Sequence, residues 1–322
     1  MRKQQNFVTG NPAVTTTYAG EFAGKYIAAA LLSATTLDNK YITIMPNVKY
    51  KSVIQKIDVN NIISNATCDF VQTGSVALTE RILEPKELQV NLSLCKQEFV
   101  DSWEALQLGF SAFDNIPANF NDFLVSYVGG KVAEATEQSI WRGVAATNGQ
   151  FGGLYPALSS SVGADGALAP VTASLSGSVT STNVIAVLNS VYDAIPQTVF
   201  GKPDVKIYIP TNVAKAYQTA LAGNGASGLG ANGYNNQLTV GQKPYDFNGI
   251  ELAWCPGLAN NAIVAGQSSN LFFGTGLLSD YNQVKVLDMA DLDGSQNYRV
   301  IMRYTAATQF GIGQDLAIYK NY

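Results

Sequence analysis

Histidine, the side chain that most often serves as an acid–base catalyst near neutral pH, is absent from all 322 residues. Its absence excludes serine–histidine and cysteine–histidine catalysis and metal sites built on imidazole. Carboxylates remain as candidates, and Glu134 and Glu137 are spaced so that both could share one face of an expected helix. No catalytic motif marks this pair, so a structural helix face is the better interpretation. We expect no catalytic, cofactor-binding or metal-binding residues, no cofactor and no enzyme activity.

Two short motifs resemble ligand-binding loops but lack the context that such loops need. Residues 223–228 match the GxGxxG spacing of dinucleotide-binding loops, which requires a strand before it and a helix after it. Here a helix is expected before the glycines, and a Gly- and Asn-rich loop follows to Gln237. Residues 291–294 resemble the start of a calcium loop, but the ligand pattern does not continue. We therefore expect a mobile loop at the first motif and a hairpin turn at the second. Asn65 and Asn91 begin glycosylation sequons by pattern only.

The composition is that of a globular chain with few charged side chains. Hydrophobic residues make up 47% of the chain and charged residues 14%, whereas ordinary soluble domains carry about a quarter charged residues. A compact monomer of 34.3 kDa would expose about 13,000 Å². The low charge predicts that much of this surface lies against other protein. The net charge of −4 argues against sequence-independent binding to nucleic acid, which needs a basic surface.

Neither a membrane span nor a secretory signal is expected. No run of about 18 apolar residues occurs, and the basic N-terminus lacks the apolar stretch of a signal peptide. Cys68, Cys95 and Cys255 are odd in number and far apart in the sequence. We therefore expect reduced thiols made in a cytoplasm and no disulfide framework.

The longest expected element is a helix over residues 116–147, to which the other elements attach. Its apolar residues recur at helical spacing, as at Phe120, Leu124, Val128 and Val132. Pro117 suits the first turn and Gly143 an exit. The adjacent Gly129 and Gly130 indicate either a tolerated bend or close approach by a neighbouring backbone. The charged side chains form a solvated or an intersubunit face, comprising Lys131, Glu134, Glu137 and Arg142.

The front third of the chain is expected to be an arm followed by a β-rich stretch. Residues 1–20 lack periodicity, and residues 21–34 have the spacing of a short helix. Strands are expected over 41–45, 50–59, 76–83 and 87–94. The alternation of apolar and polar residues predicts an antiparallel ribbon with no helix of its own to cover it. Such a ribbon is marginal alone in water and needs a partner surface. A linking segment over 96–109 leads to the long helix.

The second half is expected to form a small α/β domain and a terminal hairpin. A composition shift at 159–181 indicates a domain crossover. Helices are expected over 182–195 and 213–222 and strands over 204–209, 249–255, 262–265 and 271–273. The hairpin pairs 283–289 with 298–308, and 316–319 is a last strand.

This order of parts resembles the major capsid proteins of tailed bacteriophages, an α+β architecture called the Hong Kong 97-type fold. The phrases that carry the resemblance are LTERILEPKELQVNLSLCKQEF (78–99), DSWEALQLG (101–109) and SIWRG (139–143), together with the long helix. The resemblance covers essentially all of the chain. It implies an N-arm with a short helix, an extended β-loop, a peripheral domain with the long spine helix, an axial domain, and a return to the peripheral domain for the C-terminal hairpin. The corresponding ranges are 1–40, 41–86, 87–164, 165–281 and 282–322.

The resemblance also implies a function and a set of partners. The chain would assemble with itself, as hexamers and pentamers, into an icosahedral shell that encloses double-stranded DNA without sequence-specific binding. Portal and scaffolding proteins, and in some relatives decoration proteins, would be its other partners, with no membrane. We expect synthesis in a bacterial host cytoplasm and a final place in the virion, with the scaffolding segment either cleaved or a separate protein. An encapsulin-type nanocompartment shell is the alternative, and an enzyme or sugar-binding protein with an unusual α+β fold is a third hypothesis.

Overall fold

The structure is a computed structural model that describes residues 35–48, 50–60, 63, 65, 68, 75–95, 118–161, 171–173, 177–224, 246–276, 285–289 and 294–319. Its helices are α1 (Thr35–Asp38), α3 (Ala118–Arg142), α4 (Leu154–Ser161), α5 (Val184–Asp193) and α6 (Thr211–Asn224). Two short 3-10 turns also occur, η2 (Ser268–Asn270) and η4 (Gly313–Asp315). The helix expected over 21–34 and the linking segment 96–109 lie outside the described residues. Mixed sheets and helices confirm the α+β class.

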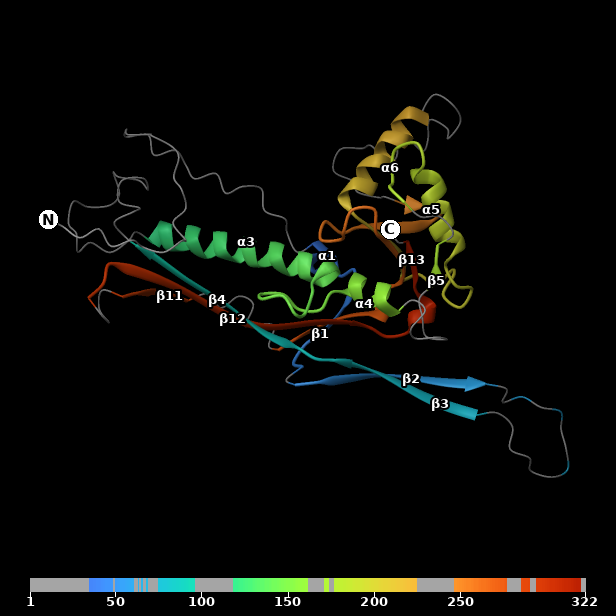
Figure 1. Ribbon diagram of the computed structural model, residues 1–322, viewed down its shortest axis with the longest axis horizontal. Helices are drawn as coiled ribbons and strands as arrows, with labels where there is room; N and C mark the ends of the chain where they lie inside the picture. The colour runs from blue at the N-terminus through green and yellow to red at the C-terminus, as the bar shows by residue number, and fades with distance from the viewer. Residues whose placement is uncertain are drawn as a thin grey trace.

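The main sheet is built around one long strand, β12 (Asn297–Phe310). Its neighbours are β1 (Thr43–Met45), β4 (Lys86–Cys95), β10 (Leu271–Thr275) and β11 (Lys285–Asp288). β4 runs antiparallel to β12 along its whole length, from Lys86 opposite Ala306 to Cys95 opposite Asn297. β11 and β12 form the expected C-terminal hairpin. In Figure 1 these strands lie beneath the long helix α3 and extend with it along the length of the molecule.

The main sheet buries one face and leaves the other polar. The face toward α3 contributes buried apolar side chains to the first core, among them Leu88, Val300, Met302 and Tyr304, which pack with Val128, Val132 and Trp141 of the helix. The opposite face carries exposed polar side chains at Gln89, Asn91, Ser93, Arg299 and Arg303. This alternation is the period-two pattern of a sheet with one covered face.

The long helix α3 ends five residues before 147, the end of the expected range, just before the glycine expected as an exit. Its last residue is Arg142, and the chain then turns at Gly143, whose N–H donates to the carbonyl oxygen of Ser139 at 3.0 Å. A side chain at Gly143 would overlap the backbone oxygen of Phe151, so only glycine fits this turn. The prediction of its start at 116 falls outside the described residues; the helix is described from Ala118.

The second sheet belongs to the expected small α/β unit and is covered on both faces. Its order is β5 (Val171–Thr172), β13 (Ala317–Tyr319), β9 (Ile263–Gln267), β6 (Val205–Ile209), β8 (Ile250–Trp254) and β7 (Asp246–Phe247). Ile207 and Ile263 point into a second core shared with α5 and α6, whereas their neighbours Tyr208 and Val264 join the first core. A sheet covered on both faces requires nearly continuous apolar strands. This explains why β6 is apolar at every position except Lys206.

Two strands lie in a different sheet from the one that sequence order suggests. β10 at 271–275, expected with the small α/β unit, pairs with β12 in the main sheet. β13 at 317–319, at the end of the chain, pairs with β9 in the second sheet. The two sheets therefore exchange strands across the boundary expected at 281/282, because pairing partners are chosen in space and not along the chain.

Two of the four strands expected in the front region form the ribbon. Only β2 (Ser52–Asn60) and β3 (Ser75–Leu83) pair as an antiparallel two-stranded ribbon, in register from Ser52 opposite Leu83 to Asn60 opposite Ser75. The fourth strand of the front region, β4, does not continue it but joins the main sheet, where α3 covers it. Figure 1 shows β2 and β3 projecting away from the sheets and helices. Within the described residues, no helix is long and apolar enough to cross a membrane.

Alanine substitution should change the free energy of unfolding in opposite directions at Gly129 and Gly257. A methyl group at Gly129, inside α3, would have no atom within 4 Å, so Gly129→Ala should raise the free energy of unfolding by about 1 kcal/mol through helix propensity. A methyl group at Gly257 would overlap the backbone carbonyl of Glu137, so Gly257→Ala should lower it by about 2–3 kcal/mol. Urea unfolding of the unassembled subunit measures both. A destabilised Gly129→Ala or a neutral Gly257→Ala variant would contradict this packing.

Candidate assembly surface

Several exposed large apolar side chains lie on the ribbon of β2 and β3 and just before it, and others lie elsewhere, among them Val144 and Phe200. Val53, Leu78 and Ile82 are 49%, 69% and 47% exposed, and Tyr50, just before β2, is 75% exposed. Isolated apolar side chains on a surface need no explanation, but several on one narrow element indicate an interaction site. Fully burying one such side chain contributes about 1.5–3 kcal/mol.

The register of the ribbon places these apolar residues on a single face. Val53 lies opposite Ile82, and four residues further along β2 Ile57 lies opposite Leu78. Residues directly opposite each other in an antiparallel pair share a face, and so do alternate residues along a strand. Between these pairs lie Gln55 and Glu80, an exposed polar pair. We call this surface the odd–even face, since it takes the odd-numbered residues of β2 and the even-numbered residues of β3.

The other face of the ribbon is used within the same chain. At its base, Leu83 is fully buried and packs with Val48 and Ala307, and Ile54 is partly buried against the same cluster. Arg81, opposite Ile54, reaches the loop that follows β12. Because this face turns toward the body of the molecule, the odd–even face turns away from it. No described residue of the chain covers Leu78, which leaves its apolar surface for another molecule.

The buried carboxylate of Glu137 joins α1 to α3. Glu137 is 0% exposed. Its carboxylate accepts hydrogen bonds from the N–H of Thr36 at 3.0 Å and from the Thr36 hydroxyl at 2.6 Å. The indole N–H of Trp141 in turn donates to the Thr36 hydroxyl oxygen at 2.8 Å. Burial raises the pKa of Glu137, and the nearby Asp38 raises it further, while hydrogen bonds from Thr36 and Gly257 lower it in part. The carboxylate is therefore a structural anchor that holds α1 on α3.

The expectation that Glu137 shares a solvated or intersubunit face with Glu134 is wrong. Glu134 pairs with Lys131 at 2.9 Å on the outer side of α3, whereas Glu137 points into the protein. The burial of Glu137 could have been inferred from its spacing to a tryptophan in the sequence. Glu137 lies four residues before the fully buried Trp141, and residues at that spacing share a helix face.

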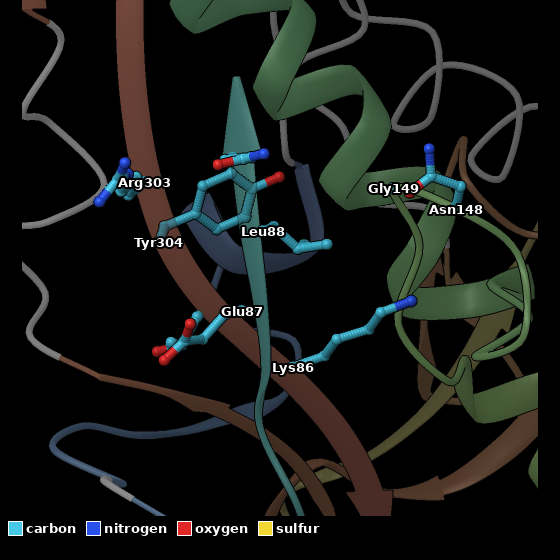
Figure 2. Close-up of a pocket in the computed structure, with 9 residues that line it drawn as sticks. Lys86, Glu87, Leu88, Asn148, Gly149, Arg303 and Tyr304 are labelled. Carbon is cyan, nitrogen blue, oxygen red and sulfur yellow. The ribbon is translucent and has the colours of Figure 1, made fainter. Parts of the chain in front are cut away.

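A polar cavity of about 670 Å³ lies where β4 begins, between β12 and the loop after α3. Its lining includes Lys86, Glu87, Gln89, Asn148 and Arg303. Figure 2 shows Lys86 extending from β4 toward the loop at Asn148 and Gly149. Its ammonium group donates to the backbone oxygens of Ala145, Thr147 and Gln150 at 3.0, 3.2 and 2.8 Å. An ammonium has three donors, so Lys86 holds the loop in place and has no free N–H left for a ligand.

The other motifs of the sequence form no site in the described part of the chain. Among the residues described, no group of three or more carboxylate or cysteine side chains could hold a metal ion. Cys68, Cys95 and Cys255 are free thiols, as expected. Most of 223–228 and of 291–294 lies outside the described residues, but α6 precedes the first motif and the β11–β12 hairpin encloses the second.

The sequence matches no family model and no curated protein, but its structure resembles solved capsids. The capsid of a native GTA particle superposes with a TM-score of 0.63 at 15% identity, covering 92% of this chain and 93% of that one. The capsid of cyanophage A-1(L) gives 0.58 at 13% identity over 96% and 98%. The capsid of Myoviridae phage XM1 gives 0.56 at 11% identity over 93% and 95%.

Such coverage of both chains at low identity defines the class of fold. The architecture is that of phage major capsid proteins, the α+β Hong Kong 97-type fold that the sequence predicted. The extended ribbon, the long helix on a sheet and the α/β unit all belong to this one fold.

The raised pKa of Glu137 makes the stability of the subunit depend on pH in a defined direction. A carboxyl whose pKa is higher in the folded than in the unfolded protein stabilises the fold when the pH is below its pKa in the unfolded state. This stabilisation is lost as the pH rises through its pKa in the folded state. The free energy of unfolding of the wild type, relative to Glu137→Gln, should therefore increase as pH falls from 7 toward the ordinary value of 4.5.

Urea unfolding of both proteins at several pH values measures this difference, which amounts to about 1.4 kcal/mol per unit of pKa separation. Glu134→Gln, at the exposed ion pair, is the matched control and should follow the wild-type profile. Parallel pH profiles for wild type and Glu137→Gln would show that the buried carboxyl keeps its ordinary pKa.

Proposed function

We propose that this protein is a major capsid protein that assembles with itself into the icosahedral shell of a tailed bacteriophage and encloses the double-stranded DNA genome. The observation that carries the proposal is the odd–even face of the ribbon. Val53, Leu78 and Ile82 present apolar surface that no described part of the same chain covers. A second copy of the chain is the occupant that the fold supports, because the structures that share this fold are capsids.

In this proposal the parts of the chain take the roles that the sequence suggested. Residues 41–86 act as the extended loop over a neighbouring subunit, 165–281 form the axial domain, and 87–164 with 282–322 form the peripheral domain. Hexamers and pentamers of the chain build the shell, and portal, scaffolding and decoration proteins are further partners. Assembly takes place in the bacterial host cytoplasm, and the protein remains in the virion without enzyme activity.

The charge of the chain suits a container for DNA. With 20 basic and 24 acidic residues, the protein has no excess of positive charge with which to hold the phosphate backbone. Weak contact with DNA allows the genome to be packed and released. Many weak contacts between subunits act together in a closed shell, so no single interface needs high affinity. The matched structures are capsids of phages and of a GTA particle, which does not favour the nanocompartment alternative.

Leu78 and its neighbour Thr79 allow a matched test of this proposal, because register places them on opposite faces of the ribbon. Leu78→Lys puts a charge on the odd–even face and should reduce the yield of particles at least about tenfold, since an interface that loses more than about 1.4 kcal/mol per contact forms tenfold less readily. Thr79→Lys adds the same charge to the other face and should assemble nearly as the wild type does. Negative-stain microscopy and analytical ultracentrifugation of the expressed proteins count particles and free subunits.

The folding of the variants must be checked separately. Leu78 is already exposed in the single chain, so Leu78→Lys should leave the circular dichroism spectrum and the midpoint of urea unfolding of the free subunit unchanged. Wild-type protein that stays a stable monomer of 34.3 kDa under every assembly condition would overturn the proposed function. Equal particle yields for Leu78→Lys and Thr79→Lys would overturn the assignment of the odd–even face.

A further inference from the structure

The base of the ribbon is held to the body of the molecule at three consecutive residues of β3. Leu83 is fully buried in the small cluster with Val48 and Ala307. The backbone approaches it closely at Gly274, where an added methyl group would lie 2.6 Å from the Leu83 Cδ2 atom. Real Cβ contacts are essentially never that short, so a side chain on the facing strand would force the leucine to move, and glycine at 274 leaves room for it. This contact fixes the position of the ribbon base.

Ile82, the residue before Leu83, is held through its backbone carbonyl oxygen. The side-chain amide of Gln309, near the end of β12, donates to the carbonyl oxygen of Ile82 at 3.0 Å. This bond attaches the ribbon to the main sheet beyond the last residue pair of β4 and β12, which joins Lys86 and Ala306. The ribbon is therefore tied to the same long strand that organises the main sheet.

Arg81 supplies the third attachment and the most directional one. Its Nε–H donates to the carbonyl oxygen of Gly311 at 3.1 Å, and its guanidinium lies 3.9 Å from the centre of the Phe310 ring. A planar guanidinium that both stacks and donates is fixed in orientation as well as position. Lysine can keep the charge but cannot reproduce this geometry.

The loop that receives Arg81 is itself rigid. Asn270, which is buried, accepts a hydrogen bond from the N–H of Ile312 at 2.8 Å and donates to the carbonyl oxygen of Ile312 at 2.8 Å. Its own carbonyl oxygen accepts the N–H of Gly311 at 3.0 Å. A methyl group at Gly311 would lie 2.7 Å from the Asn270 side-chain oxygen. The acceptor for Arg81 is thus held by three hydrogen bonds to one buried asparagine.

The three attachments at its base determine the direction of the ribbon, which is long and narrow. Each ribbon strand has nine residues and so extends about 30 Å from the base. A change of 5° in direction at the base would move the far end by about 2.6 Å over this length. A shift of that size is enough to misplace side chains that must pack against another molecule.

We propose that Arg81 is a positioning residue that sets the angle between the ribbon and the main sheet, and through that angle the curvature of the assembled shell. This inference rests on the proposed function, because curvature has meaning only if the ribbon contacts a second copy. Loss of Arg81 leaves Leu83, Ile54 and Gln309 to hold the base, so the ribbon remains attached but takes a wider range of directions. The subunit then assembles with a wider range of angles between neighbours.

The free subunit provides a test that does not depend on assembly. Spin labels at Gln55→Cys on the ribbon and Ser160→Cys on α4, both exposed positions, report the distance between ribbon and body by pulsed electron resonance. Cys68 and Cys95 are replaced by serine, and the buried Cys255 is left unlabelled. Gln55 lies three residues beyond Ser52 and so about 10 Å from the base. Arg81→Ala should therefore broaden or shift the distance distribution by about 1 Å for each 5° of change in ribbon direction, and Arg81→Lys should give an intermediate result. A distribution identical to that of the wild-type background would overturn the proposal.

Particle size gives the second readout. Arg81→Ala should produce particles with a broader range of diameters, or open sheets and tubes, in negative-stain images. Lys51→Ala is the matched control, because Lys51 forms an exposed ion pair with Glu84 at 3.3 Å at the same base, and such pairs contribute little. Lys51→Ala particles should match the wild type in diameter. Arg81→Ala particles of wild-type size and uniformity would show that Arg81 does not set curvature.

The two proposals fail in different ways. Absence of particles from the wild type itself overturns the proposed function and leaves the distance measurement to decide whether Arg81 orients the ribbon. Wild-type particles together with an unchanged ribbon distance in Arg81→Ala overturn the role of Arg81 alone. Should Arg81→Ala fail to assemble while its urea midpoint stays close to that of the wild type, a broadened distance distribution supports the proposal and an unchanged one contradicts it.

Discussion

Apolar side chains on a β-sheet face must be covered, and the three β structures of this chain meet that requirement to different degrees. The second sheet is covered on both faces, by α5 and α6 on one side and by the first core on the other. The main sheet is covered on one face by α3 and is polar on the other. The ribbon of β2 and β3 has one face seated at its base and an apolar face that the described chain leaves open. Of these β structures, the ribbon carries several exposed apolar side chains on one face, whereas exposed apolar side chains such as Val144 and Phe200 lie outside the sheets.

Close contacts at three glycines hold together the segments of the body to which the ribbon is attached. Gly143 lies against the backbone oxygen of Phe151, and Gly257 lies against the carbonyl of Glu137. Gly274 lies against the side chain of Leu83. At each glycine an added methyl group would overlap the neighbouring atom. Glycine makes such approaches possible at an entropic cost in the unfolded state. The buried Glu137 adds a polar joint between α1 and α3. Together these contacts turn the long helix, the main sheet and the base of the ribbon into one unit.

Much of the secondary structure could be predicted from the sequence, whereas the pairing of strands and the burial of one charge could not. Period-two alternation located β2 and β3 within a residue or two, and helical spacing located α3 and α5. Alternation says nothing about which strand is the neighbour, so β4 was placed in the ribbon although its apolar face packs under α3. The sequence predicts a surface position for Glu137, either solvated or between subunits, because charge usually indicates exposure. Its donors come from Thr36 and Gly257, which are far away in the sequence, and a single sequence does not reveal such long-range hydrogen bonds.

The separation of core and contact surface explains how a chain with an open apolar face can exist before it meets a partner. Both large cores form without any side chain of the ribbon beyond its base, since the ribbon residues that pack on the body, Leu83 and Ile54, belong to a small separate cluster. Folding of the body therefore does not require the odd–even face to be buried, and the exposed face is narrow because it belongs to two strands only. A narrow apolar strip costs little solubility in one subunit. In the proposed shell, the same strip repeated in many copies would supply a stabilisation that grows with the number of contacts made together.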